Sequence, residues 1–140
     1  MKKLLVEACI DNLDIVIDFV NEDLEQHNCE SNFQSEIDIA VEEIFMNIAR
    51  YAYKPENGNV AILISAKEEF VIEFEDTGKP YNPLLRSDPD LNIPISERKP
   101  GGLGIFLVKQ LMDKVSYARV DNKNVLTMTK KTVRSVKCEV

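Results

Sequence analysis

The sequence predicts an α+β fold, a two-layer sandwich in which three helices pack on one face of a mostly antiparallel sheet. Two long segments before residue 53 carry apolar residues at helical spacing, and two later pairs of short segments look like β-hairpins. A glycine-rich run near residue 102 then opens a third apolar helix. At 140 residues and 15.9 kDa, the chain is expected to form one domain, residues 1–140, with a sizeable core.

The first half of the chain reads as one strand followed by two helices. Residues 3–9 are apolar enough for a first strand. Asp11 is expected to cap a helix that runs to about Asn28, because aspartate accepts hydrogen bonds from the free N–H groups of a first turn. Ser35 is expected to cap a second helix, whose apolar stripe continues to Ala52.

A hairpin is expected next, with strands at Val60–Ala66 and Phe70–Glu75. Period-two alternation places Asp76 on the same face as the core residue Phe74. A carboxylate on that face needs a strong donor, and the exocyclic amine of adenine is one; Gly78 would let the ring approach the backbone. The alternative is that Asp76 only begins a turn with Gly78.

Residues 77–100 show no periodicity and hold five of the six prolines, and so long a connection is expected to be either a functional lid or a disordered segment. The glycine run that follows can hold phosphate oxygens, because the first N–H groups of a helix lack internal partners. It departs from the dinucleotide fingerprint and from the P-loop, which disfavours both. A flexible loop capped by a helix is the alternative. That helix is expected to reach Lys114, and strands at Val115–Val120 and Val125–Lys130 follow, joined by a turn at residues 121–124.

Glu43 and Asn47 lie one helical turn apart beside the apolar stripe of the second helix. An amide oxygen there can bind Mg²⁺ together with phosphate oxygens, and the carboxylate can accept a hydroxyl proton. The alternative is an ordinary polar flank of an amphipathic helix.

Composition excludes several classes of function. A net charge of −7 and a pI near 4.8 argue against a nucleic-acid partner. No apolar run is long enough to span a membrane, and no leader pattern is seen, so a cytoplasmic protein is expected. Three widely spaced cysteines indicate neither a zinc site nor a disulfide framework. The single histidine, His27, is expected to be an exposed helix-end residue.

Together the three clusters resemble the nucleotide-binding motifs of the GHKL ATPase superfamily, and more narrowly those of the bacterial anti-sigma factor serine/threonine kinases. Residues 41–53 are similar to the pattern E-x-x-x-N-x-x-x-[HY]-[AG]-Y, and residues 76–83 to D-x-G-x-P-[FY]-[DN]-P. Residues 101–113 are similar to G-G-x-G-[IL]-x-[LI]-[VI]-x-x-[LF]-[MV]-D. The resemblance covers essentially the whole chain.

This resemblance implies the Bergerat ATP-binding fold, with ATP and Mg²⁺ as cofactors. Glu43 would be the general base, Asn47 would hold Mg²⁺, and Asp76 would accept a hydrogen bond from the adenine amine. The other residues that the resemblance places at the nucleotide are Gly78, Pro80, Gly101, Gly102, Leu103, Gly104 and Ile105.

The resemblance also implies partners. The family phosphorylates a serine or threonine of a small anti-anti-sigma (STAS) protein, and its members are usually homodimers that sequester a sigma factor. Two alternatives stay open: a nucleotide-binding module that sequesters without phosphoryl transfer, and an ATP domain acting with a histidine phosphoacceptor. Two positions depart from the pattern. Tyr51 stands where histidine is frequent, and Lys123-Asn124 replaces a common Gly-Thr, so that Asn124 is a candidate to share the adenine contact.

Overall fold

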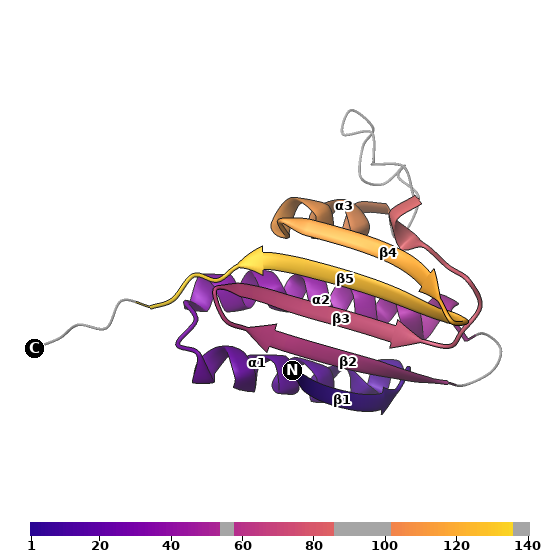
Figure 1. Ribbon diagram of the computed structural model, residues 1–140, viewed down its shortest axis with the longest axis horizontal. Coiled ribbons are helices and arrows are strands. Elements are labelled where there is room, and N and C mark those ends of the chain that lie inside the picture. Colours follow the sequence, from indigo (N-terminus) through magenta and orange to yellow (C-terminus); the bar gives the residue numbers. More distant parts are fainter. Residues whose placement is uncertain (54–57, 86–101, 136–140) are drawn as a thin grey trace, which may run out of the picture.

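The computed structural model describes residues 1–53, 58–85 and 102–135. Five strands form one sheet in the order β1-β2-β3-β5-β4, and every neighbouring pair is antiparallel. Figure 1 shows the sheet in front of the helices, with the long strands β3 and β5 at its centre. The strands are β1 (Lys2–Glu7), β2 (Asn59–Ala66), β3 (Glu69–Asp76), β4 (Lys114–Val120) and β5 (Lys123–Lys131).

Helices α1 (Leu13–Gln26), α2 (Ser31–Tyr51) and α3 (Gly102–Leu111) lie together behind the sheet, and α2 contacts both of the others (Figure 1). Two short 3-10 turns, η1 (Ile10–Asn12) and η2 (Pro83–Leu85), complete the described elements. The predicted fold class, three helices on one face of an antiparallel sheet, is therefore confirmed. No helix in the described ranges is long and apolar enough to cross a membrane.

The core lies between α2 and the two central strands, as the two periodicities predict. In α2, Ile37, Ile44 and Phe45 are at most 1% exposed, and in β3 the alternate residues Phe70 and Ile72 are fully buried. The α2 stripe is apolar along almost its whole length, so the helix lies flat on the sheet. This packing fixes which side of α2 faces the end of β3.

The predicted start of the second helix is wrong. The helix begins at Ser31, and Ser35 lies inside it, where its Oγ donates a hydrogen bond to the Ser31 carbonyl at 3.0 Å. The reason is that the apolar stripe begins one turn earlier than expected: Phe33 is 2% exposed and packs edge-on against Phe70, with ring centroids 6.3 Å apart. Burial of that ring extends the helix upstream.

Both expected limits of the first helix also differ. Asp11 does not cap α1 but lies in η1, and α1 begins at Leu13. The helix ends at Gln26, because Asn28 adopts a left-handed backbone conformation with φ of 56° that a helix cannot continue.

The last helix and the last turn are shorter than predicted. α3 ends at Leu111, whose carbonyl accepts a hydrogen bond from the Lys130 ammonium group. The final turn consists of Asp121 and Asn122 with φ of 50° and 63°, the conformation that two-residue hairpin turns require. Asn124 therefore belongs to β5, directly opposite Asp76 in the register.

Candidate functional site

A pocket opens where α2, the end of β3 and the start of β5 meet. It encloses about 330 Å³ of space between atoms, part of it open to solvent. Its wall is mostly apolar, with three buried polar side chains from three different elements. The lining residues are Ile44, Asn47, Ile48, Ala52, Phe74, Asp76, Tyr81, Pro83, Tyr117, Asn124 and Leu126.

Asp76 ends β3 on the inner face and is 4% exposed, as the alternation predicts. Its Oδ1 accepts hydrogen bonds from the Gly78 amide at 3.0 Å and from Asn124 Nδ2 at 2.9 Å. Burial raises the pKa of the Asp76 carboxyl group, while the bonds from Asn124 and Gly78 oppose that rise. The turn with Gly78 is present, and the carboxylate also lines the pocket, so the two interpretations do not exclude each other.

Gly78 is held against the end of α2 rather than exposed to the pocket. A Cβ placed on it would lie 2.3 Å from the Ala52 carbonyl oxygen, and the adjacent Lys79 amide donates to that same oxygen at 3.0 Å. Arg119 donates to the Gly78 carbonyl at 2.8 Å. The backbone of α2 alone thus requires glycine here. Room for a base stays a prediction, and Pro80 is exposed just beyond this contact.

Glu43 and Asn47 form a pair on the pocket side of α2. Asn47 is 5% exposed, and its Nδ2 donates to the Glu43 carbonyl at 2.7 Å and to Glu43 Oε1 at 3.0 Å. This arrangement uses the donor end of the amide, and within the described ranges no donor reaches Asn47 Oδ1, which leaves that oxygen for a ligand. Asn47 lines the pocket, which fits a ligand that needs an oxygen donor.

The first turn of α3 lies directly on the Glu43 carboxylate. A Cβ on Gly104 would be 2.1 Å from Glu43 Cδ, so only glycine leaves room for that carboxylate. Gly102 and Leu103 begin the helix, and Ile105 is 1% exposed in the core. Gly101 and most of the expected lid lie outside the described residues. A negative charge beside a helix N-terminus is electrostatically favourable.

Two tyrosines at and just after the end of α2, for which the motif alone predicts no contacts, connect this part of the chain to other segments. The Tyr53 hydroxyl donates to the Asn59 carbonyl at 2.6 Å and accepts from the Thr77 amide at 2.8 Å. The Tyr51 ring lies 5.5 Å from the ring of Tyr81, which lines the pocket. Their partners are 24 or more residues away, except for Asn59, so the local pattern does not reveal them.

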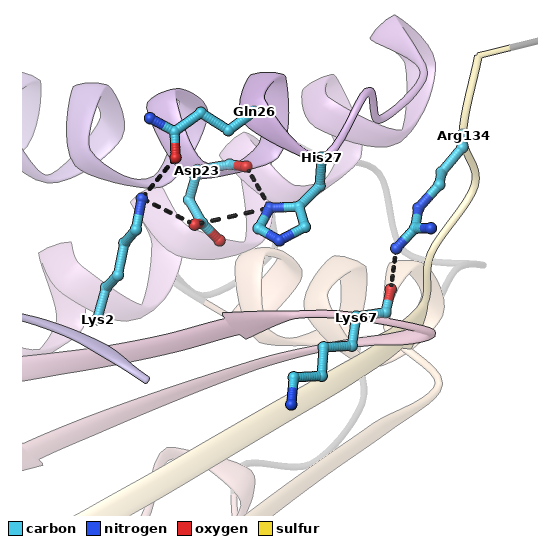
Figure 2. A network of polar contacts seen from close by, with 6 residues as sticks. All are labelled: Lys2, Asp23, Gln26, His27, Lys67 and Arg134. Atoms are coloured by element: carbon cyan, nitrogen blue, oxygen red, sulfur yellow. Dashed lines mark hydrogen bonds and ion pairs between the residues drawn. The ribbon is translucent and has the colours of Figure 1, made fainter.

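His27 lies in a separate polar cluster at the opposite end of the sheet. It follows α1, as expected, but it is half-buried rather than exposed, with Nδ1 2.8 Å from the Asp23 carbonyl oxygen. Figure 2 shows Lys2, Gln26 and His27 converging near Asp23, with Arg134 reaching the Lys67 carbonyl. Lys67 follows β2 at the end of β3 remote from Asp76, which separates this cluster from the pocket.

Lys2 is expected to stabilise the fold through this cluster. Its Nζ lies 3.1 Å from Oδ1 of Asp23, a side chain that is only 3% exposed, and 2.7 Å from Gln26 Oε1. Lys2→Met removes the ammonium partner of a buried carboxylate, so the free energy of unfolding should fall by about 1–2 kcal/mol in urea titrations. Lys3→Met, next in the same strand and exposed, is the control. Equal losses in both variants would contradict a specific role for Lys2.

No cluster of three or more histidine, cysteine, aspartate or glutamate side chains suited to a metal is found in the described ranges. Cys9 and Cys29 are free thiols there, and Cys138 lies outside them. A cation at the pocket would therefore rely on few protein oxygens, such as Asn47 Oδ1, together with ligand oxygens. Magnesium bound with phosphates has this requirement.

The family model and the curated relatives that match this chain agree with one another. The family model described as histidine kinase-like ATPase domain matches residues 6–130. The serine/threonine-protein kinase BtrW of Bordetella bronchiseptica is 30% identical over 95 residues, covering 65% of this chain and 66% of that protein. The serine-protein kinase RsbW of Bacillus mycoides is 33% identical over 97 residues, covering 66% of this chain and 60% of that protein. The matched part thus spans less than two thirds of these relatives.

Solved structures agree on the fold. The RsbU and RsbW domains of a Mycobacterium tuberculosis protein superpose with a TM-score of 0.62 at 14% identity, over 98% of this chain and 35% of that chain. The mycobacterial sensor histidine kinase MprB gives a TM-score of 0.52 at 16% identity, over 94% of this chain and all of that chain. At these identities the likeness concerns the fold alone.

Proposed function

Because the chain belongs to the family of histidine kinase-like ATPase domains, we propose that it binds ATP in this pocket and transfers the γ-phosphoryl group to a protein serine or threonine. One observation carries the proposal: the start of α3 lies on Glu43, one turn from Asn47, which lines the same pocket as Asp76. The carboxylate proposed to accept from the base, the amide oxygen proposed to bind the cation, the proposed proton acceptor and a helix N-terminus thus lie close together. The kinase names of the curated relatives support the same reaction.

At the base end, Asp76 would accept a hydrogen bond from the adenine amine. The apolar side chains Ile44, Ile48 and Leu126 line the same pocket and offer surfaces against which a purine ring can pack. The buried carboxylate then supplies the orientation, since its second oxygen favours a ligand group that donates to it.

At the phosphate end, the first turn of α3 would hold phosphate oxygens through its backbone N–H groups. Asn47 Oδ1 would ligate Mg²⁺, which when bound neutralises charge on the phosphates. Glu43 would accept the proton of the attacking hydroxyl group. Its hydrogen bond from Asn47 Nδ2 keeps the carboxylate beside Gly104, where that hydroxyl must arrive.

The partner assignments follow from the family resemblance of the sequence motifs. The substrate would be an anti-anti-sigma protein of the STAS type, and the bound partner a sigma factor held by a homodimer. No nucleic acid or membrane contact is part of this proposal. The acidic net charge of −7 is consistent with recognition of proteins rather than nucleic acids.

Calorimetric titration with Mg²⁺-ATP tests the nucleotide site. Asp76→Asn should weaken ATP binding by about tenfold or more, because an amide cannot replace an ionised acceptor. The matched control is Asp38→Asn, since Asp38 is a half-buried carboxylate that also accepts from an asparagine, Asn21 at 3.2 Å, but does not line the pocket. Equal affinity in Asp76→Asn and the parent protein would reject the adenine contact.

The same titration has an expected pH dependence. The pKa of Asp76 is raised by burial above its usual 3.8, and the ionised form is the one that accepts from the base. ATP affinity should therefore fall as the pH is lowered through that raised value, and it should be regained above it. Asp76→Asn should flatten this part of the profile, whereas Asp38→Asn should preserve it.

A further inference from the structure

The Asn124 side chain uses all of its hydrogen-bonding groups within the protein. Its Nδ2 donates to Asp76 Oδ1 at 2.9 Å and to the Lys79 carbonyl at 2.8 Å. Its Oδ1 accepts from the Tyr81 amide at 3.2 Å and from the Tyr117 hydroxyl. Two donors and two acceptor sites are all that a primary amide offers. At 4% exposure it lies in the pocket wall but has no group left for a base.

The fully hydrogen-bonded Asn124 side chain determines the orientation of the Asp76 carboxylate. Asp76 Oδ1 receives two N–H groups, one from Gly78 and one from Asn124, and that oxygen is thereby fully used. Among the described residues, no hydrogen bond reaches the second oxygen, Oδ2. The carboxylate is thus held by one oxygen and offers the other to the pocket that it lines.

We infer that Asn124 is a positioning residue that sets the base preference of the site, by holding Asp76 so that only an amine at purine position 6 satisfies its second oxygen. The inference rests on the proposed ATP site. Adenine carries that amine, whereas hypoxanthine carries an oxygen there, which the carboxylate repels. Asn124 thus acts through Asp76 and not by contacting the base, which changes the role considered for it from the motif alone.

Asn124 also connects Asp76, through which it sets the base preference, to the segment that follows Gly78. The same amide holds the Lys79 carbonyl and the Tyr81 amide, and Tyr81 lines the pocket. The Tyr117 hydroxyl, from β4, donates to the same Oδ1 as the Tyr81 amide. Residues 76–81 and the β4–β5 hairpin, two regions distant in sequence, therefore meet at one side chain.

The test compares the affinities of ATP and inosine triphosphate in the parent protein and in Asn124→Asp. The two bases differ at position 6 of the purine, an amine against an oxygen, and in the hydrogen that hypoxanthine carries on N1. This variant keeps the shape and the acceptor oxygen but replaces the two N–H donors with a second carboxylate beside Asp76. Two adjacent carboxylates share a proton, and a protonated acid can donate to the oxygen of inosine. ATP affinity should fall by about tenfold or more, while inosine triphosphate affinity falls less or rises.

The decisive measurement is the ratio of the ATP affinity to the inosine triphosphate affinity, because a general loss of stability lowers both affinities alike. It should favour ATP in the parent protein and move toward unity in Asn124→Asp, most strongly at low pH. Tyr117→Phe, which removes one of the groups that hold the amide, should move the ratio in the same direction but less, and it provides the test should Asn124→Asp not fold. Asn21→Asp is the matched control, because it disrupts an equivalent bond to Asp38 away from the pocket and should leave the ratio unchanged.

Failure of the inference and failure of the proposed function give different results. If the parent protein binds ATP and the ratio is the same in the parent, Asn124→Asp and Tyr117→Phe, the role of Asn124 is overturned and the ATP site stands. If the folded parent protein binds neither nucleotide, both are overturned. A ratio that shifts equally in Asn21→Asp also overturns the role, since the effect would then not arise at the pocket.

Discussion

Replacement of Glu43 by glutamine is expected to slow phosphoryl transfer by roughly 10²–10⁴-fold while leaving the Kd for ATP within about threefold. Glutamine has the same shape, and its amide oxygen can still accept from Asn47 Nδ2, which now lies 3.0 Å from Glu43 Oε1. The variant loses the negative charge of the carboxylate and, with it, the ability to take a proton. The measurement is single-turnover transfer of labelled γ-phosphate to a STAS-domain protein, beside calorimetry of ATP binding.

Glu42→Gln is the matched control for that experiment. Glu42 is the preceding residue of α2, carries the same charge and is exposed, so its removal changes the net charge equally without touching Gly104. Full phosphoryl-transfer activity in Glu43→Gln would contradict the assignment of Glu43 as the general base. A parent protein that binds ATP but transfers nothing to any STAS-domain partner would favour the sequestration module, and transfer to histidine would favour the two-component alternative.

Gly78→Ala is expected to give the largest loss of stability of any single methyl addition at the site, about 2–3 kcal/mol. The new Cβ would lie 2.3 Å from the Ala52 carbonyl oxygen and 2.8 Å from its carbonyl carbon, and backbone at the end of a packed helix cannot move aside cheaply. The shift would also strain the Lys79 hydrogen bond to the same oxygen. Urea unfolding with a fixed m-value measures the loss.

Gly104→Ala provides the contrast. The three atoms nearest to its Cβ would all belong to the Glu43 carboxylate, the far end of a flexible side chain that can rotate away. We therefore expect a smaller loss of stability together with a large loss of phosphoryl transfer, because the displaced carboxylate no longer lies beside the start of α3.

A stability loss in Gly78→Ala below about 0.5 kcal/mol, no larger than that of an ordinary surface substitution, would contradict the close packing against α2.

Local patterns predicted much of this fold correctly, since burial of one face imposes a period on each element. The alternation from Phe70 to Asp76 placed the carboxylate on the inner face, where it is 4% exposed, and the helical spacing placed Glu43 and Asn47 one above the other. The errors occurred at element ends. Ser35 appeared to be a helix cap because a serine before an apolar stripe is a common start signal, but burial of Phe33 moved the start of α2 to Ser31.

By itself, the sequence determined the fold class and the family, and it named the polar residues proposed for the site, because periodicity and spacing are properties of adjacent residues. Only the tertiary structure decided how these residues act on one another. Gly104 lies on Glu43 across 61 positions of chain, and Asn124 binds Asp76 across 48, through packing that no local pattern encodes. Glycine at position 78 is required by the Ala52 carbonyl for the same reason: close contacts between distant segments arise only when the helices and the sheet pack together.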